Sequence, residues 1–279
     1  MSLENRIEEL FAQGAEAKRD EARSLVKELR DALSSGEVRA AEPDSGSSSG
    51  WRVNPWVKRG ILLAFRFGTN IDQTADGRGL FFDKDTLPLK RQSVASGVRV
   101  VPGGSSIRDG AYLGRDVICM PPMYINIGAW IGDGSLIDSH ALVGSCAQVG
   151  RRVHVSAAAQ IGGVLEPIGA LPVIVEDDVM IGGNCGVYEG TVIKQRAVLA
   201  AGTIITGSTP LYDITTGSII SAEPGQPLIV PEGAVVVPGS RPLAADTAKA
   251  WGLSVATPVI VKYRDARTSA RTALEQWIR

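Results

Sequence analysis

Aromatic residues, histidine and cysteine are all scarce in this chain of 279 residues. Phe, Trp and Tyr together make up 5% of it, and the only histidines are His140 and His154. A zinc site with three histidine ligands therefore cannot come from one chain alone. The three cysteines, Cys119, Cys146 and Cys185, cannot all pair with one another and show no CxxC spacing. We expect them to be reduced thiols, as is usual in the cytoplasm.

Long apolar runs and an excess of one charge are missing as well. The formal net charge is −1 and the pI is about 6.2, so the chain lacks the basic surface of a general nucleic-acid binder. No window approaches the ~20 apolar residues of a membrane span. The first residues, MSLENRIEELF, lack the basic-then-apolar order of a signal peptide. We therefore expect a cytoplasmic protein with no nucleic-acid partner and no membrane span.

Residues 1–95 are predicted to form a mainly helical N-terminal domain. Apolar residues recur at helical spacing within residues 3–11 and 25–33. A third helix is expected over residues 54–67, because Asn followed by Pro is typical of a helix start. Residues 43–50 (PDSGSSSG) have the composition of a flexible, low-complexity loop.

Every sixth residue is aliphatic from residue 107 onward. Nine of ten residues in a first series, and all seven in a second, are Val, Ile or Leu. The first series is Ile107, Leu113, Cys119, Ile125, Ile131, Ile137, Val143, Val149, Val155 and Ile161; the second is Val175, Ile181, Val187, Ile193, Leu199, Ile205 and Leu211. A period of six excludes an amphipathic helix and simple strand alternation. It is the hexapeptide signature of a parallel β-helix.

The predicted β-helix covers residues 96–240 and is followed by a C-terminal extension over 241–279. Each hexapeptide would supply one short strand and one turn, with the aliphatic side chain pointing inward. The narrow interior explains why aromatic rings are scarce, and the abundant glycines, 32 in all, suit the tight corners. Within the extension we expect a strand over 258–263 and a final helix over 270–279.

Two irregularities in the repeat mark candidate functional positions. Ile161 and Val175 are 14 residues apart where an unbroken frame needs 6 or 12, so residues 162–174 are predicted to leave the coil as a loop. Long loops on a rigid scaffold often carry function. Asp138 occupies a corner position that favours glycine, where a carboxylate gains nothing from core packing.

The hexapeptide region resembles acyl-CoA-dependent transferases built on the left-handed parallel β-helix. A closer and more specific resemblance is to the tetrahydrodipicolinate N-succinyltransferase family. It is carried by GVRVVP (97–102), INIG (125–128), VGSCAQVG (143–150), IGGVLEP (161–167) and VIVK (259–262), with FRF (65–67) and FFDK (81–84) in the N-terminal part. The resemblance implies a mainly β protein whose β-helix is left-handed.

The resemblance also implies an activity. Succinyl-CoA, as a co-substrate rather than a bound cofactor, would donate its acyl group to the amine of ring-opened tetrahydrodipicolinate. The products would be N-succinyl-2-amino-6-oxopimelate and CoA, in lysine and diaminopimelate biosynthesis. The family works as homotrimers with sites between neighbouring subunits. An acetyl-CoA-dependent transferase on the same or a related amine is the alternative enzyme. A γ-type carbonic anhydrase, which the two histidines fit poorly, and a scaffold without CoA affinity are alternatives of other classes.

Acyl transfer from a thioester to an amine needs a base for the amine proton and donors for the developing oxyanion. Asp138 and Arg99 match the family's substrate-binding aspartate and arginine; Asp138 could also accept the proton, and a guanidinium suits the substrate's carboxylates. Glu166 and Glu189 are candidates for a second catalytic carboxylate. Many members of the family carry a glutamate where this chain has Gly186, so the general base stays open.

Cationic side chains late in the chain are candidates for the phosphates of CoA, with an ordinary solvated charge as the alternative for each. They are Lys194, Arg196, Lys262 and Arg264. His154 could act as a base, although packing is the commoner role of a single histidine, and His140 has no counterpart in the family. Cys119 and Cys185 are expected in the core, while Cys146 could line the site. No metal site is expected.

Overall fold

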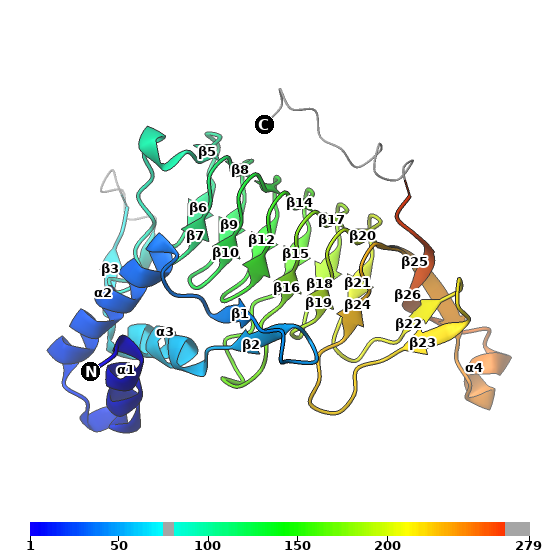
Figure 1. Cartoon of the computed structure of the whole chain (residues 1–279), viewed down its shortest axis with the longest axis horizontal. Coiled ribbons are helices and arrows are strands. Elements are labelled where there is room, and N and C mark those ends of the chain that lie inside the picture. The colour runs from blue at the N-terminus through cyan, green and yellow to red at the C-terminus, as the bar shows by residue number, and fades with distance from the viewer. Residues whose placement is uncertain (75–80, 266–279) are drawn as a thin grey trace.

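The computed structural model describes residues 1–74 and 81–265. The N-terminal helices lie at one end of a long prism of short parallel strands, and a C-terminal hairpin lies at the other end (Figure 1). The helices are α1 (Leu3–Ala12), α2 (Arg19–Ser35), α3 (Pro55–Phe67) and α4 (Asp246–Ala250), with two 3-10 turns, η1 (Gly14–Glu16) and η2 (Val94–Ser96).

Helices α1, α2 and α3 confirm the three predicted helical segments. Asn54 stands at the N-cap of α3 with Pro55 in the first turn, as expected. The helices share an apolar core with Ile7, Leu29 and Ile61 at its centre, all at most 2% exposed. Gly60 brings α2 and α3 together, because a Cβ there would lie only 2.3 Å from a Leu29 methyl group. A short antiparallel pair, β3 (Asn70–Asp72) and β4 (Phe82–Lys84), follows α3.

Residues 43–50 form a loop, as predicted, but the two short strands on either side of it were not predicted. These residues form the turn of an antiparallel hairpin, β1 (Ala41–Pro43) and β2 (Trp51–Val53), which lies across one face of the prism (Figure 1). The amide of Asp44 donates to the carbonyl of Gly50 at 2.8 Å, and Lys194 Nζ in the prism donates to the carbonyl of Ser49 at 2.7 Å. The loop is therefore held against the prism by a contact with a residue far along the chain.

The prism has three faces of parallel strands. Face 1 comprises β5 (Arg99–Val100), β8 (Ile118–Cys119), β11 (Leu136–Ile137), β14 (His154–Val155), β17 (Met180–Ile181) and β20 (Val198–Leu199). Face 2 comprises β6 (Ser106–Ile107), β9 (Tyr124–Ile125), β12 (Leu142–Val143), β15 (Gln160–Ile161), β18 (Gly186–Val187) and β21 (Ile204–Ile205). Face 3 comprises β7 (Tyr112–Leu113), β10 (Trp130–Ile131), β13 (Gln148–Val149), β16 (Ile174–Val175), β19 (Val192–Ile193) and β24 (Ile229–Val230).

Each strand pairs with strands one coil before and one coil after it. Leu136, for example, lies opposite Ile118 and His154, each 18 residues away. The chain turns from face 1 to face 2 at the first corner (138–141 in one coil). It turns from face 2 to face 3 at the second corner (144–147) and back to face 1 at the third corner (150–153). The predicted hexapeptide frame is thereby confirmed.

The interior of the prism is filled by the predicted aliphatic columns. Ile125, Ile131 and Ile137 are fully buried in one continuous core, together with Cys119 and Cys185, as expected. Cys146 differs from the expectation that it could line the site. It is fully buried between the prism and the N-terminal helices, because the second corner is where those helices pack.

Burial makes all three thiols poor nucleophiles. It raises the pKa of Cys119 and Cys146 to about 12, and it raises the pKa of Cys185 as well. Because thiol reagents attack the thiolate, we expect no protein thiol to titrate within minutes in the native chain at about pH 8. Unfolding in guanidinium should release all three. Rapid reaction of any cysteine in the folded chain would contradict this prediction.

The coil is interrupted where the sequence predicts it. After Ile161 the chain leaves the prism and returns at Ile174, so residues 162–173 form a loop at the second corner. The last coil continues into β25 (Ala234–Pro242), which pairs with β26 (Ser254–Tyr263), while β22 (Leu211–Asp213) and β23 (Ser218–Ile220) extend the same sheet. Strand β26 confirms and lengthens the strand predicted over 258–263. The predicted helix over 270–279 lies outside the described residues, among which no helix could cross a membrane.

Candidate functional site

The predicted carboxylates Glu166 and Glu189 lie in one pocket at the second corner. The pocket has a volume of about 410 Å³ and is bounded on one side by the loop 162–173 and on the other by the next coil. Glu166 comes from the loop, and Glu189 stands at the corner after β18 with a left-handed backbone (φ 55°). The insertion in the repeat is thus the element that brings these two side chains together.

Tyr188 also lines this pocket, and the sequence analysis did not identify it. A Cβ at Gly186 would lie 2.4 Å from the Tyr188 ring, and one at Gly162 would lie 2.9 Å from it. The ring therefore occupies space that a side chain at position 186 would need. The strands on either side of Gly186 carry larger residues, Gln160 and Ile204, at the matching positions. The unusual glycine at position 186 is therefore the feature of the sequence that could have indicated space for the Tyr188 ring.

Lys58 on α3 holds the loop 162–173 in position. It is fully buried on α3, and its Nζ donates to the carbonyl of Ala170 at 2.6 Å and to that of Pro167 at 3.5 Å. Burial lowers the pKa of this ammonium group. Both carbonyls belong to residues that line the pocket, so the N-terminal helices determine the position of the loop that carries Glu166.

Asp138 lies on a different edge of the prism, at the first corner. Its Oδ1 accepts a hydrogen bond from the amide of Ser139 at 2.7 Å, and its Oδ2 lies 4.0 Å from His154 Nε2 on β14. The carboxylate is partly exposed, with 31% of the side-chain surface accessible. His140 is exposed at the same corner and does not line the pocket of Glu166. Within one chain, Asp138 is therefore separated from Glu166 and Glu189.

Arg99 lies on the same face as Asp138. It is exposed on β5, the first strand of face 1, opposite Ile118, which in turn lies opposite Leu136. Arg99 and Leu136 are thus two coils apart in one column, about 10 Å along the prism at the usual spacing of strands. The structure places Arg99 and Asp138 on one side of the prism and the two glutamates on another edge.

The candidate contacts for CoA phosphates gather near the third corner and the end of the prism. Arg264 Nη1 donates to the carbonyls of Asp178 at 2.9 Å and Arg196 at 3.4 Å, and burial together with the Arg196 charge lowers its pKa. Lys262 lies nearby on β26 and contacts Asp265 at 3.0 Å. Lys194 instead holds the β1–β2 hairpin, as its contact with Ser49 shows.

Comparison with known proteins identifies the family to which this chain belongs. A family profile described as tetrahydrodipicolinate N-succinyltransferase N-terminal matches residues 2–67, and one described as hexapeptide repeat of succinyl-transferase matches residues 172–207. A 2,3,4,5-tetrahydropyridine-2,6-dicarboxylate N-succinyltransferase from Polynucleobacter asymbioticus is 42% identical over 264 residues, covering 92% of this chain and 90% of the relative. The chain belongs to the tetrahydrodipicolinate N-succinyltransferase family. A member from Idiomarina loihiensis is 38% identical and covers 100% of this chain and 98% of its own.

A solved structure supports the fold of the family. A Campylobacter jejuni protein assigned as a 2,3,4,5-tetrahydropyridine-2-carboxylate N-succinyltransferase matches with a TM-score of 0.51 at 16% identity, over 84% of this chain and 62% of that one. The predicted left-handed parallel β-helix is confirmed. The resemblance to the family, drawn from the hexapeptide text and the GSCAQVG and IGGVLEP segments, is also confirmed. Among residues 1–74 and 81–265, no three His, Cys, Asp or Glu side chains form a group suited to a metal ion.

Proposed function

We propose that this chain transfers the succinyl group of succinyl-CoA to the amine of ring-opened tetrahydrodipicolinate. The products are N-succinyl-2-amino-6-oxopimelate and free CoA, and the reaction belongs to lysine and diaminopimelate biosynthesis. The observation that carries the proposal is the relationship to N-succinyltransferases of this name along nearly the whole chain. Three free cysteines, all buried, are consistent with work in the cytoplasm.

The proposed active site is shared between two subunits of a homotrimer. In one chain Asp138 stands at the first corner, whereas Glu166 and Glu189 stand at the second. Rotation about a threefold axis can bring the first corner of one prism against the second corner of its neighbour, which repeats one complete site three times. The separation of the carboxylates within a chain supports this arrangement.

In the proposed mechanism the neutral amine attacks the thioester carbonyl directly. A thioester is already activated, so no covalent enzyme intermediate is required. Asp138 holds the amine and accepts its proton as the new C–N bond forms, and the C–S bond then breaks to release CoA. Arg99 binds a carboxylate of the acceptor through its guanidinium fork. Either Glu166 or Glu189 provides a second carboxylate near the amine.

The CoA phosphates are proposed to contact Arg196, Lys262 and Arg264, which lie close together at the end of the prism. Lys194 was a fourth candidate, and its ammonium group is already engaged by Ser49 and by Glu176 at 2.8 Å. We therefore assign Lys194 to the hairpin and leave the phosphates to the other three cations.

The decisive experiment measures release of the CoA thiol with tetrahydrodipicolinate and each of two donors. We expect kcat/KM to be about 100-fold or more higher with succinyl-CoA than with acetyl-CoA, because a pocket built for a carboxylate is left with unpaired polar groups by a donor that lacks it. A preference for acetyl-CoA would show that the donor is wrong. No thiol release with either donor would contradict the proposed reaction.

A further inference from the structure

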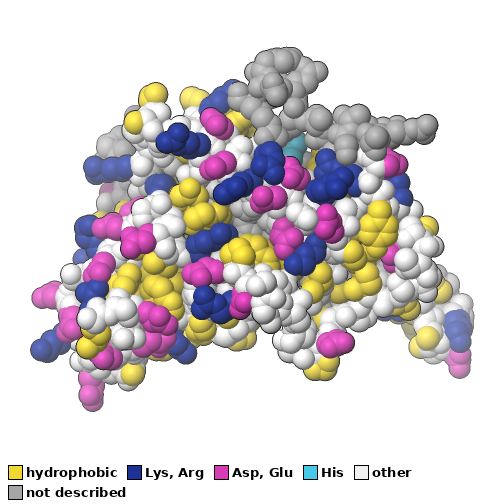
Figure 2. Space-filling view, in the orientation of Figure 1, with side chains coloured by type: hydrophobic (Ala, Val, Ile, Leu, Met, Phe, Trp, Pro, Cys, Tyr) yellow, Lys and Arg dark blue, Asp and Glu magenta, His cyan; other side chains and the backbone are white. Residues whose placement is uncertain are grey.

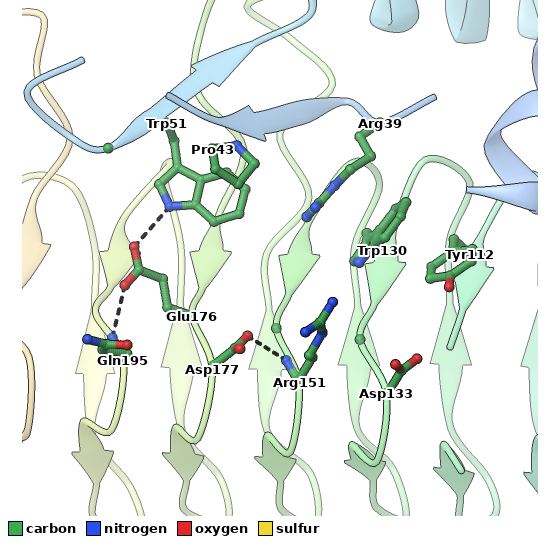
Figure 3. Close-up of a pocket in the computed structure, with 13 residues that line it drawn as sticks. Arg39, Pro43, Trp51, Tyr112, Trp130, Asp133, Arg151, Glu176, Asp177 and Gln195 are labelled. Atoms are coloured by element: carbon green, nitrogen blue, oxygen red, sulfur yellow. Dashed lines mark hydrogen bonds between the residues drawn. The ribbon is translucent and has the colours of Figure 1, made fainter. Parts of the chain in front are cut away.

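A second cavity lies at a different corner of the prism from the proposed catalytic groups, between the β1–β2 hairpin and face 3 (Figure 3). We call it the hairpin groove; the residues that matter here are Arg39, Trp51, Trp130, Asp133, Arg151 and Asp177. Its volume is about 390 Å³, within the range of small-molecule sites. The groove opens at the third corner, whereas Asp138 lies at the first corner and Glu166 and Glu189 lie at the second.

The groove is held open by fixed contacts. Trp51 Nε1 donates to Glu176 Oε1 at 3.0 Å, and Lys194 Nζ donates to the same oxygen at 2.8 Å. Lys194 also binds the carbonyl of Ser49, so the hairpin is fastened to the prism at two points. A ligand would find this cavity already formed and would not have to order the hairpin at its own cost in free energy.

Arg39 is placed in the groove by aromatic rings. Its guanidinium lies 4.0 Å from the centre of the Trp130 ring and 5.5 Å from that of Trp51. Trp130 is itself stacked on Tyr112, with 3.9 Å between ring centres. Arg39 Nε donates to Gln148 Oε1 at 3.0 Å. These contacts fix the plane of the guanidinium and direct its two terminal nitrogens into the groove (Figure 3).

The terminal nitrogens of Arg39 lack a protein acceptor. In the part of the chain that the structure describes, neither nitrogen takes part in a hydrogen bond or an ion pair. Burial lowers the pKa of this guanidinium to about 10. Neither terminal nitrogen is buried without a partner, so this pair of parallel N–H donors is accessible from the groove and available to an anion. Arg151 extends from the third corner toward Arg39 and adds a second guanidinium (Figure 3).

Two carboxylates restrict what this anion can be. Asp177 Oδ1 accepts from the amide of Arg151 at 2.8 Å, and Asp133 Oδ1 accepts from the amide of Arg115 at 3.0 Å. Each aspartate thus binds a backbone amide at a corner of the coil through one oxygen, and Asp177 Oδ2 also lies 3.9 Å from Arg152 Nη2. Acidic and basic side chains are interspersed over this side of the molecule (Figure 2). A ligand with negative charge only would be repelled by both aspartates.

We propose that the hairpin groove binds a small zwitterion, a free α-amino acid, at a site separate from the catalytic carboxylates Asp138, Glu166 and Glu189. Its carboxylate is held by Arg39 and Arg151, and its ammonium group by Asp177 or Asp133. The Trp51 ring contacts its side chain, because the two faces of Trp130 are already covered by Arg39 and Tyr112. The charges of the ligand then match the charges that line the groove.

Tryptophan fluorescence of the full chain tests the proposal, because two of the tryptophans line the groove. The probes are L-leucine, L-phenylalanine and L-glutamate, each titrated to about 10 mM, with acetate and n-butylamine as ligands of one charge only. We expect a saturable change with at least one amino acid and none with acetate or n-butylamine. No saturable change with any amino acid, or an equal one with acetate or n-butylamine, would overturn the proposal.

Variants identify the groove as the origin of the signal. Arg39→Gln and, independently, Arg151→Gln should each weaken binding about tenfold or more, the usual effect of losing a charge-assisted hydrogen bond. Arg151 is exposed on a corner of the coil, so its substitution leaves the fold intact even if Arg39→Gln disturbs the hairpin. Arg52→Gln is the matched control, because Arg52 lies on the same hairpin and pairs with Glu42 outside the groove. Unchanged affinity in both test variants would show that the amino acid binds elsewhere.

Discussion

Exchange of Asp138 for asparagine should lower kcat by about 10²- to 10⁴-fold, the range expected when a general base is removed. Asparagine keeps the size of the side chain and cannot accept the amine proton. Asp138 is partly exposed, and its carboxylate accepts a hydrogen bond from the Ser139 amide at 2.7 Å, which the asparagine oxygen can also accept, so the variant should keep its fold. Thiol release would be measured at saturating succinyl-CoA, with the melting temperature as the control. Activity within a few-fold of the parent would exclude Asp138 as the base.

Mixing two inactive variants tests whether the site is shared between subunits. Asp138→Asn and Glu189→Gln affect different corners of the same prism. In trimers that mix the two chains at random, about a quarter of the sites combine an intact first corner from one subunit with an intact second corner from another. Co-expression of the two variants should therefore restore up to about a quarter of the activity per site. If Asp138 and Glu189 acted within one chain, every site would stay inactive.

Replacement of Lys58 by methionine should reduce kcat about 10- to 100-fold while the chain stays folded. The ammonium group holds the carbonyls of Pro167 and Ala170, and without it the loop that carries Glu166 loses its anchor. A displacement of about 1 Å at a catalytic group can cost about 100-fold in rate. Methionine is of similar length, and it removes a buried charge that pairs with no carboxylate among residues 1–74 and 81–265, which limits the loss of stability.

The matched control for Lys58 is Lys27→Met, because Lys27 is an exposed lysine on α2 that pairs with Asp31 on the same helix. Limited proteolysis distinguishes local loosening of the loop from a general loss of stability. In the Lys58 variant, cleavage should become faster within residues 162–173 and stay unchanged elsewhere. Full activity together with an unchanged cleavage pattern would show that the loop is positioned without Lys58.

The sequence predicts the prism well because its period is repeated in each coil. One inward-pointing side chain recurs every six residues, so the positions of the strands can be predicted without knowing which residues contact one another. The interruption of this period between Ile161 and Val175 predicts the loop that the structure shows at 162–173. Glu166 was identified because it lies in that break. Asp138 was identified because a charged residue stood where the pattern calls for glycine.

The parts that the sequence did not predict depend on contacts between distant segments. The hairpin is ordered by Lys194 and Glu176, more than a hundred residues beyond the serines of its turn. Lys58 has the pattern of an ordinary helix lysine, and only the packing of α3 against the second corner shows that it is buried. Tyr188 becomes part of the pocket because two glycines, Gly186 two residues before it and Gly162 in the previous coil, leave space for its ring.

Parallel stacking of coils has a consequence at the two ends of the prism. A terminal coil presents a row of unpaired amide and carbonyl groups, to which another chain could add and extend into a fibre. Here the first end is covered by the segment before β6, where the Lys90 amide donates to the Ile107 carbonyl at 2.8 Å. The other end is covered by the long pair β25 and β26, whose strands run antiparallel and cannot continue the helix. The segments outside the repeat thus cover both ends of the prism. They prevent other chains from adding to a structure whose repeat could otherwise be extended indefinitely.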